Sequence, residues 1–298
     1  MAPSRIIIAG ASGLIGRALT ASLRADGAEV IHLVRRPPRG PHEVAWLQAG
    51  DALSPDILAG ADAVIGLNGA SIGRLPWTPG YRDTLRTSRL TPTRTLASAL
   101  RALGADAPAF LSASAVGRYG HRPGELLDEG SSAGDTFLAH LCVEWEGAAE
   151  TAGDQVRTVL LRTASVVHPE AVLKPLTRLA RLGLAGPLGT GRQVWPWISL
   201  EDEVRGIRHA MESDLSGPMN LTGPTPATAA DIVRALSRRL HRPYLLPAPA
   251  WALRLGLGRA AADCLLLADA DVAPRVLLRS GFAFRHRTAQ DAIDAAIG

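Results

Sequence analysis

The chain has 298 residues, of which 47% are hydrophobic and 20% are charged, a balance typical of a globular protein with a large core. Its formal net charge is +4, but basic and aromatic residues do not alternate along any stretch, so we expect no nucleic-acid partner. The two cysteines, Cys142 and Cys264, are too few for a disulfide framework or a metal cluster, and we expect no metal.

We expect neither a signal peptide nor a membrane-spanning helix in this sequence. The N-terminus enters an apolar strand pattern within a few residues, without the charged and apolar segments of a signal peptide. No apolar run reaches the roughly 18 residues that a membrane-spanning helix needs. We therefore expect no membrane partner and a cytoplasmic location.

The first motif is the stretch RIIIAGASGLIG at residues 5–16. Residues 5–9 are almost fully apolar, as in a parallel strand buried on both faces, and residues 14–27 carry leucines at helical spacing. Backbone amides at the start of such a helix favour a pyrophosphate. We predict a dinucleotide site, with an ordinary glycine turn as the alternative. The residues predicted to hold the dinucleotide are Gly10, Ser12, Gly13, Leu14, Ile15 and Gly16.

The end of the second predicted strand, residues 29–36, indicates which dinucleotide binds. An acidic residue about 20 positions after the glycine loop would bind the ribose 2′-hydroxyl of NAD. This chain has Arg35 and Arg36 there, and guanidinium groups suit a 2′-phosphate because they match its charge and its geometry. The sequence therefore predicts NADP(H), unless the two arginines only solubilise the strand end.

Strands and helices continue to alternate along the chain. Residues 62–71, 107–117, 157–167 and 217–223 are apolar strand candidates. One helix is predicted to begin at Pro79 with Thr78 as its cap and to be interrupted at Thr91 and Pro92, and a second covers residues 137–153. This order predicts an α/β fold with a doubly wound parallel sheet, whose ligands bind at the carboxyl ends of the strands.

Residues 173–186 and 228–243 are helical patterns separated by segments rich in proline and glycine. They indicate a small C-terminal subdomain on the substrate side. We predict a nucleotide-binding domain at residues 1–168, to which residues 190–223 return, and a subdomain made of residues 169–189 and 224–298.

A rival motif lies at residues 69–73, which fit the G-x-S-x-G elbow of α/β-hydrolases with Ser71 as the nucleophile. An elbow turns directly into a helix, whereas Pro76 and Pro79 delay the next helix here. The alternative is a loop of small residues that lets the backbone approach a cofactor. On that interpretation Asn68, Gly69 and Ala70 contact the cofactor.

Several motifs together carry a family resemblance. They are the glycine loop, GLNGASIGRLPW, SASAVGRYG, LCVEWEGAA, GPLGTGRQVWPWISLEDEV, NLTGPTPAT and GFAF. Their order resembles the epimerase-like subgroup of the atypical and extended short-chain dehydrogenase/reductase superfamily, often labelled nucleoside-diphosphate-sugar epimerase and ending in a small domain of unknown function. The resemblance covers nearly the whole chain. It implies an extended Rossmann fold, NADP(H) and a possible homodimer, and it leaves the substrate open.

The superfamily's chemistry uses a Ser or Thr hydroxyl with a Tyr, whose pKa is lowered by a Lys four residues later. The resemblance implies Ser114 as the hydroxyl, with Ser112 as the second choice. When Glu146 is matched to the glutamate of the motif, Leu138 occupies the Tyr position and Cys142 the Lys position. The usual acid/base pair is therefore absent.

Other residues are candidates to replace that pair. We predict catalytic roles for Tyr119 and Cys142, against the alternatives of loop packing and a small buried side chain. Solvation is the stronger interpretation of the remaining candidates, which are His140, Asp128 and Glu129.

The segment GTGRQVWPWIS supplies candidates for the substrate. Arg192 is predicted to bind a substrate phosphate or carboxylate, and Trp195 and Trp197 to line the pocket, with core packing as the alternative for the tryptophans. Ser199 stands where similar proteins commonly have a histidine.

These observations predict an NADP(H)-dependent oxidoreductase or epimerase that transfers a hydride to or from a small or phosphorylated substrate. A protein that binds NADP(H) without catalysis, as a redox sensor or interaction partner, is the alternative, because the Tyr and Lys are missing. A serine hydrolase that uses Ser71 is a remote third.

Overall fold

The computed structural model describes residues 4–48 and 52–298. Its centre is a seven-stranded sheet in which every neighbouring pair is parallel, in the order β10-β7-β5-β4-β1-β2-β3. The strands of this sheet are β1 (Arg5–Ala9), β2 (Glu29–Val34), β3 (Glu43–Ala45), β4 (Ala63–Gly66), β5 (Ala109–Ala115), β7 (Thr158–Thr163) and β10 (Gly217–Leu221). The predicted doubly wound parallel sheet is confirmed.

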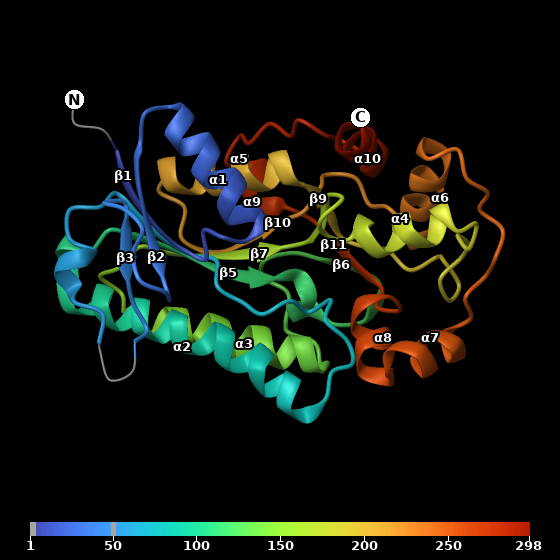
Figure 1. Ribbon diagram of the computed structural model, residues 1–298, viewed down its shortest axis with the longest axis horizontal. Coiled ribbons are helices and arrows are strands. Elements are labelled where there is room, and N and C mark those ends of the chain that lie inside the picture. The colour runs from blue at the N-terminus through green and yellow to red at the C-terminus, as the bar shows by residue number, and fades with distance from the viewer. Residues whose placement is uncertain (1–3, 49–51) are drawn as a thin grey trace.

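Helices cover both faces of this sheet, as Figure 1 shows. One face carries α1 (Leu14–Ala25), α5 (Leu200–Glu212) and α9 (Arg275–Arg279), and the other carries α2 (Pro79–Leu103) and α3 (Phe137–Glu150). Within the described residues, no helix has both the length and the apolar character that crossing a bilayer requires.

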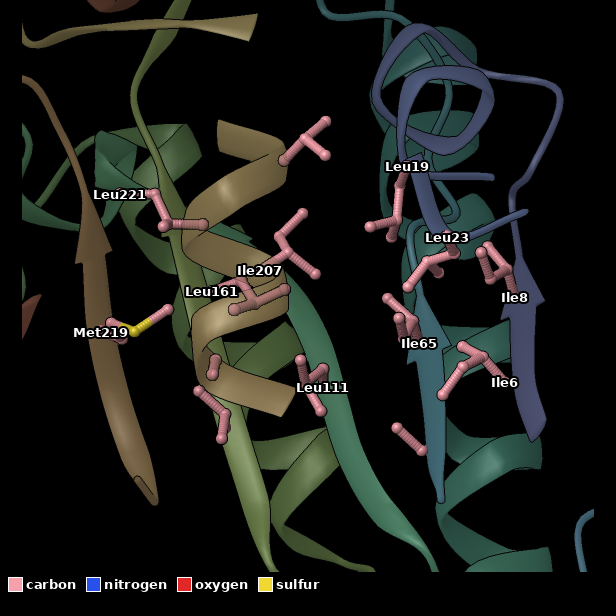
Figure 2. Close-up of a cluster of buried hydrophobic side chains, with 14 of the residues drawn as sticks. Ile6, Ile8, Leu19, Leu23, Ile65, Leu111, Leu161, Ile207, Met219 and Leu221 are labelled. Carbon is pink, nitrogen blue, oxygen red and sulfur yellow. The ribbon is translucent and has the colours of Figure 1, made fainter. Parts of the chain in front are cut away.

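The core follows from the alternation of side chains along each strand. Ile6 and Ile8 of β1 point to the layer of α1 and α5, whereas Ile7 points to the layer of α2 and α3. Figure 2 shows the first of these clusters, in which Leu111 and Leu161 of the central strands contact the side of α5. Because both faces are covered, the central strands are apolar at nearly every position.

The helix that begins at Pro79 is not interrupted, so the predicted break at Thr91 and Pro92 is wrong. Thr78 caps α2 as expected, its Oγ1 accepting a hydrogen bond from the Tyr81 amide, and the helix then continues to Leu103 with Pro92 inside it. Buried leucines on both sides of the proline, among them Leu85 and Leu96, hold the two halves against the rest of the protein. Their burial outweighs the cost of about 3 kcal/mol for an interior proline.

The remaining elements gather at one end of the sheet, to the right in Figure 1. They form two short sheets, in which β6 pairs with β11 and β8 pairs with β9. A separate cluster of buried residues, which includes Trp195, Trp197 and Leu236, fills this part of the protein. The elements are β6 (Arg122–Leu127), β8 (Ser165–Val167), α4 (Leu173–Arg181), β9 (Trp197–Ser199), α6 (Ala229–Arg239), α7 (Ala250–Leu257), α8 (Arg259–Leu265), β11 (Ala270–Val272) and α10 (Ala289–Ile297).

Leu111, in the middle of β5, offers a test of this core. Its side chain is fully buried, and we expect Leu111→Ala to lower the free energy of unfolding by about 2–5 kcal/mol, because a cavity replaces the lost methyl groups. Leu255→Ala is the matched control, since Leu255 is 82% exposed and its loss should change stability by less than about 0.5 kcal/mol. Urea denaturation measures both, and equal effects would contradict the packing described.

Candidate active site

The glycine turn lies at the carboxyl end of β1, in the middle of the sheet. Gly10 has a φ of +88°, and a Cβ built on it would lie 2.7 Å from the carbonyl carbon of Leu67, in the loop after β4. A Cβ on Gly16 would lie 2.5 Å from the Gly10 oxygen. These two glycines are therefore required by the close approach of β1, α1 and the next loop.

Gly13 differs from the other two glycines. Its φ is −72°, which any residue adopts, and the only described atom near a Cβ built there is the Gly10 oxygen at 3.4 Å. The fold itself therefore does not require a glycine at this position. Gly13 is also the residue before the first turn of α1, and no described side chain caps that end of the helix. The amides of the first turn are thus available to an anion.

The two arginines after β2 have different environments. Arg36 donates to both carboxylate oxygens of Glu43, at 2.7 and 2.6 Å, and the Arg36 guanidinium holds the pKa of Glu43 down at about 2. Arg35 is exposed, and its side chain makes no hydrogen bond or ion pair to a described residue. Of the two predicted phosphate ligands, Arg36 is thus engaged, whereas the guanidinium of Arg35 has no partner among the described residues.

The loop of residues 67–78 follows β4 and passes next to the glycine turn. The Oδ1 atom of Asn68 is buried and has no hydrogen-bond partner among the described residues. The amide of Ala70 donates to Ser88 Oγ, and the Ala70 oxygen accepts from Arg89, so this part of the loop is held in place. An unpartnered acceptor beside the glycine turn is a natural contact for a bound ligand.

The same loop bears on the hydrolase alternative. Ser71 lies within it, and α2 begins only at Pro79, so the strand does not turn directly into a helix here. The Oγ atom of Ser71 accepts a hydrogen bond from the Gly73 amide at 3.2 Å. The geometry of a nucleophile elbow is therefore absent at Ser71.

A cavity of about 160 Å³ opens at the carboxyl ends of β5 and β7. Ala115 ends β5, Thr163 ends β7, and both line the cavity. The opposite wall comes from residues 264–270 at the end of α8 and the start of β11. The cavity thus lies where ligands of doubly wound sheets bind, between the sheet and the C-terminal elements.

Behind this cavity, Ser114 and Tyr119 belong to one buried chain of hydrogen bonds. Ser114 Oγ donates to Glu146 at 2.6 Å, and Arg162 donates to both oxygens of Glu146, at 2.8 and 2.9 Å. Arg162 also donates to the Tyr119 hydroxyl at 2.9 Å, and that hydroxyl donates to Asn220 at 2.7 Å. Burial raises the pKa of Tyr119 above its usual value of 10.0.

Two positions on α3 show what replaces the usual acid/base pair. Leu138, at the position that the resemblance gives to Tyr, lines the cavity. Cys142, one turn later, is 4% exposed and does not line the cavity. Burial raises the pKa of the Cys142 thiol to about 11, so it is protonated at neutral pH. Its predicted role in catalysis would require a thiol and not a thiolate.

The three predicted substrate residues lie in different environments. Trp195 lines the cavity, and its indole donates to the Leu266 oxygen at 3.1 Å. Trp197 is fully buried below it and donates to the Thr225 oxygen at 2.9 Å. Arg192 is exposed and does not line the cavity. The structure thus places one of the three predicted residues at the cavity.

Ser199, which stands where similar proteins commonly have a histidine, has an imidazole beside it after all. The Nδ1 atom of His286 lies 3.0 Å from Ser199 Oγ. Asp202 accepts hydrogen bonds from the backbone amides of Arg285 and His286, at 2.7 and 2.9 Å. A residue 87 positions further along the chain thus brings an imidazole ring to this place, and no motif in the sequence indicates it.

Sequence reasoning missed the polar residues that matter most for the cavity. Thr163, Ser165 and Cys264 line it, and Arg162 anchors the buried chain behind it. Only Arg162 had a visible signal, because a charged residue inside an apolar strand requires a buried partner. Among the described residues, the structure contains no cluster of three His, Cys, Asp or Glu side chains arranged to hold a metal.

Glu203 is a second missed acid, and it lies directly behind the cavity wall. It is fully buried on α5, and its Oε1 accepts a hydrogen bond from Thr163 at 2.7 Å. Its Oε2 is buried without a hydrogen-bond partner among the described residues. Burial raises the pKa of this carboxyl to about 8, so Glu203 is neutral at pH 7.

This burial predicts a pH dependence of stability. The raised pKa stabilises the folded state below pH 4.5, and that contribution is lost as the pH rises to about 8, because the unfolded state releases the proton first. We expect the unfolding free energy of the wild type to fall relative to Glu203→Gln between pH 5 and 8, by at most about 1.4 kcal/mol per pH unit. Urea denaturation across this range is the measurement. Glu212→Gln, at the exposed end of α5, is the control, and parallel curves for the wild type and Glu203→Gln would contradict the assignment.

Comparison with known proteins agrees with this geometry. Residues 6–221 match the NAD dependent epimerase/dehydratase family, and residues 248–296 match a domain of unknown function, DUF1731. The epimerase family protein Mb2239 of Mycobacterium bovis is 42% identical over 99% of this chain and 98% of its own length. The epimerase family protein SDR39U1 of Homo sapiens is 32% identical over 94% of this chain and 95% of its own length.

A crystal structure of human SDR39U1 (isoform 2) with NADPH superimposes on this chain with a TM-score of 0.87 at 30% identity. The superposition covers 98% of this chain and 99% of the human chain. These matches confirm the resemblance inferred from the motifs. The chain belongs to the NAD dependent epimerase/dehydratase family.

Proposed function

We propose that this protein is an NADP(H)-dependent oxidoreductase that acts on a small molecule in the cavity at the ends of β5 and β7. Residues 1–168 and 190–223 would form the nucleotide half. Residues 169–189 and 224–298 would form the substrate side, which includes the wall at residues 264–270.

The conformation and surroundings of Gly13 are the main support for this proposal. A glycine that only shapes a turn has a positive φ or a close neighbour, as Gly10 and Gly16 do. Gly13 has neither, since its φ is −72° and the one described atom near a Cβ built there is the Gly10 oxygen at 3.4 Å. A glycine at such a place lets a phosphate approach the amides of α1 without meeting a Cβ. The unpartnered Asn68 Oδ1 in the adjacent loop also fits a bound nucleotide.

Arg35 supports NADP(H) over NAD(H). Its guanidinium, which follows β2 and binds no residue that the structure describes, lies about 20 residues after the glycine turn, where the adenosine ribose lies in similar folds. The predicted role of Arg36 is less direct, because Glu43 already binds its guanidinium. The crystal structure of the human relative with NADPH is consistent with this preference.

The residues around the cavity would bind and orient the substrate. When bound, NADPH supplies a hydride for the reduction of a carbonyl carbon, and water supplies the proton for its oxygen. The Ser165 hydroxyl and the Cys264 thiol line the cavity and can hydrogen-bond a substrate oxygen. Ser114 remains the hydroxyl implied by the family, and its bond to Glu146 would have to open for it to reach a substrate.

A protein that only senses NADP(H) is the second candidate. Leu138 and Cys142 favour it, because neither can act as the phenol or ammonium of the usual pair. The cavity favours an enzyme, since a sensor would not need a second site beside the nucleotide half.

Isothermal titration with NADPH and NADH tests the proposed cofactor. We expect Arg35→Ala to weaken NADPH binding at least tenfold, or about 1.4 kcal/mol, and to leave NADH binding unchanged. Arg101→Ala removes the same charge from the far end of α2 and should change neither affinity. If neither nucleotide binds to the wild type, the glycine turn is only structural and the proposed function is wrong.

Gly13→Ala separates the fold from nucleotide binding. Because a Cβ there meets only one described atom, at ordinary contact distance, we expect the free energy of unfolding, measured by urea denaturation, to change by less than about 0.5 kcal/mol. NADPH binding should fall at least tenfold, since the methyl group occupies the approach of the phosphate. Gly10→Ala is the contrasting variant, and its positive φ and close neighbour should lower stability. Unchanged NADPH affinity in Gly13→Ala would contradict the site.

A further inference from the structure

Arg118 is a largely buried cation whose side chain donates no hydrogen bond to any residue that the structure describes. It belongs to the short 3₁₀ helix Val116–Tyr119 that follows β5, and its side chain is 20% exposed. Among the described residues its one polar contact is Glu146, whose Oε2 lies 3.3 Å from Nη1. The Nε atom is buried without a partner. A guanidinium taken out of water requires acceptors, and this one lacks most of them.

The neighbouring Arg162 has the partners that Arg118 lacks. Its Nε and Nη2 form one edge of the guanidinium and donate to the two carboxylate oxygens of Glu146, at 2.8 and 2.9 Å. Its Nη1 donates to the Tyr119 hydroxyl and to the Glu129 backbone oxygen. In Arg118 the same edge of Nε and Nη2 has no hydrogen-bond partner among the described residues. Such an edge presents two parallel N–H groups, which match the two oxygens of a carboxylate.

The charges around Glu146 do not cancel. Arg118 and Arg162 face this one carboxylate, so the three side chains carry one excess positive charge. The carboxylate of Glu129 accepts from two backbone amides instead, at 3.2 and 3.1 Å. A ligand with a single negative charge would neutralise the excess, whereas a phosphate dianion would leave a negative charge in the same buried place. The charge balance therefore favours a carboxylate over a phosphate.

Arg118 belongs to the segment that forms the sheet-side wall of the cavity. Gly117, which precedes Arg118, and Gly120, which follows Tyr119, both line the cavity. Gly117 also packs against Leu138, the lining residue of α3, since a Cβ built on Gly117 would lie 3.4 Å from Leu138 Cβ. The cavity is open on one side. A ligand held at this wall can therefore extend beyond the cavity, and the reacting end of the cofactor can enter the same space.

The acids that flank the opposite wall, residues 264–270, are already engaged. Asp263 is paired with Arg254 at 2.8 Å, and Asp269 accepts a hydrogen bond from the Val194 amide at 2.9 Å. Arg192, the cation that the sequence suggests for a substrate anion, is exposed and lies outside the lining. Within the part of the chain that the structure describes, Arg118 is thus the cation of the wall segments that still has donors for a ligand.

The phosphates of the cofactor are too far away to be the partner of Arg118. In the proposed function they bind at the glycine turn after β1, and β4 lies between β1 and β5 in the sheet. At about 4.8 Å per strand, the ends of β1 and β5 are about 10 Å apart. An anion that meets Arg118 therefore comes from the substrate.

We propose that Arg118 binds a carboxylate group of the substrate, so that the substrate is a carbonyl compound that carries a carboxylate. This inference rests on the proposed function, which supplies the hydride that the carbonyl carbon accepts. The edge of Nε and Nη2 holds the two carboxylate oxygens, and Ser165 or Cys264 hydrogen-bonds the carbonyl oxygen in the cavity. A neutral analogue of the same shape binds more weakly, because it leaves the excess charge at Arg118 without a partner.

Fluorine NMR with a matched pair of probes tests this assignment. 4-Fluorobenzoate carries the carboxylate, and 4-fluorobenzamide has nearly the same shape without the charge. We expect the wild type to bind 4-fluorobenzoate at least tenfold more tightly at pH 7, both with and without saturating NADP⁺. NADPH oxidation gives a second readout, in which 4-carboxybenzaldehyde should have a higher kcat/KM than 4-carbamoylbenzaldehyde.

Variants of Arg118 locate the binding. Arg118→Gln should weaken the binding of 4-fluorobenzoate at least tenfold and change that of 4-fluorobenzamide less than twofold. Arg118→Lys keeps the charge but loses the paired donors, so its affinity for 4-fluorobenzoate should lie between those of the wild type and Arg118→Gln. Arg101→Gln removes an exposed arginine at the far end of α2 and should change neither affinity. Circular dichroism checks each fold, and Arg118→Lys carries the test if Arg118→Gln does not fold.

The outcomes separate this inference from the proposed function. Equal affinity of the wild type for the two probes would overturn the inference, as would equal effects of the Arg118 variants and Arg101→Gln on 4-fluorobenzoate. If Arg118→Gln weakened NADPH binding as much as Arg35→Ala does, the cofactor would supply the anion, and the inference would again be wrong. A protein that binds no NADPH but prefers 4-fluorobenzoate through Arg118 would refute the proposed function and support the carboxylate site.

Discussion

Parallel pairing of the central strands is the constraint on which the rest of the structure depends. Because β1, β4, β5 and β7 are neighbours and run in one direction, their carboxyl ends meet at one edge of the sheet. Segments far apart in the sequence therefore converge there: the glycine turn, the loop with Asn68, and the cavity wall with Ala115 and Thr163. The covered faces in turn require strands that are apolar on both sides, and the isoleucines of β1 meet that requirement.

The buried pair of Glu146 and Arg162 ties this edge of the sheet to the helix beside it. Arg162 is part of β7 and Glu146 of α3, so the ion pair joins a central strand to the helix that would normally carry the acid/base pair. Tyr119 and Asn220 extend the same chain to β10. A buried charge is tolerable only when it is paired and hydrogen-bonded, and removing either partner would leave the other without compensation.

Much of the fold could be predicted from the sequence because its signals are local. The isoleucines of residues 6–8, the glycines that follow and the cap at Thr78 each specify structure within a few positions. Pro92 led to the wrong prediction of a helix break. The local preference of proline against a helix interior is outweighed here by the burial of the helix, which depends on what the helix packs against. The place of Cys264 in the cavity wall could not be predicted, because the cavity brings α8 next to residues more than a hundred positions earlier, such as Leu138.

The candidate site, like the fold, can be predicted from the sequence only where its signals are local. Arg35 and Arg36 look equivalent in the sequence, and only the position of Glu43 shows that one of them is engaged. Leu138 could be placed at the Tyr position from a motif, but its meaning depends on the cavity that it lines. A leucine in place of the phenol removes a proton donor and adds an apolar wall in one substitution. The loss of the phenol and the apolar character of this part of the wall therefore have the same physical origin.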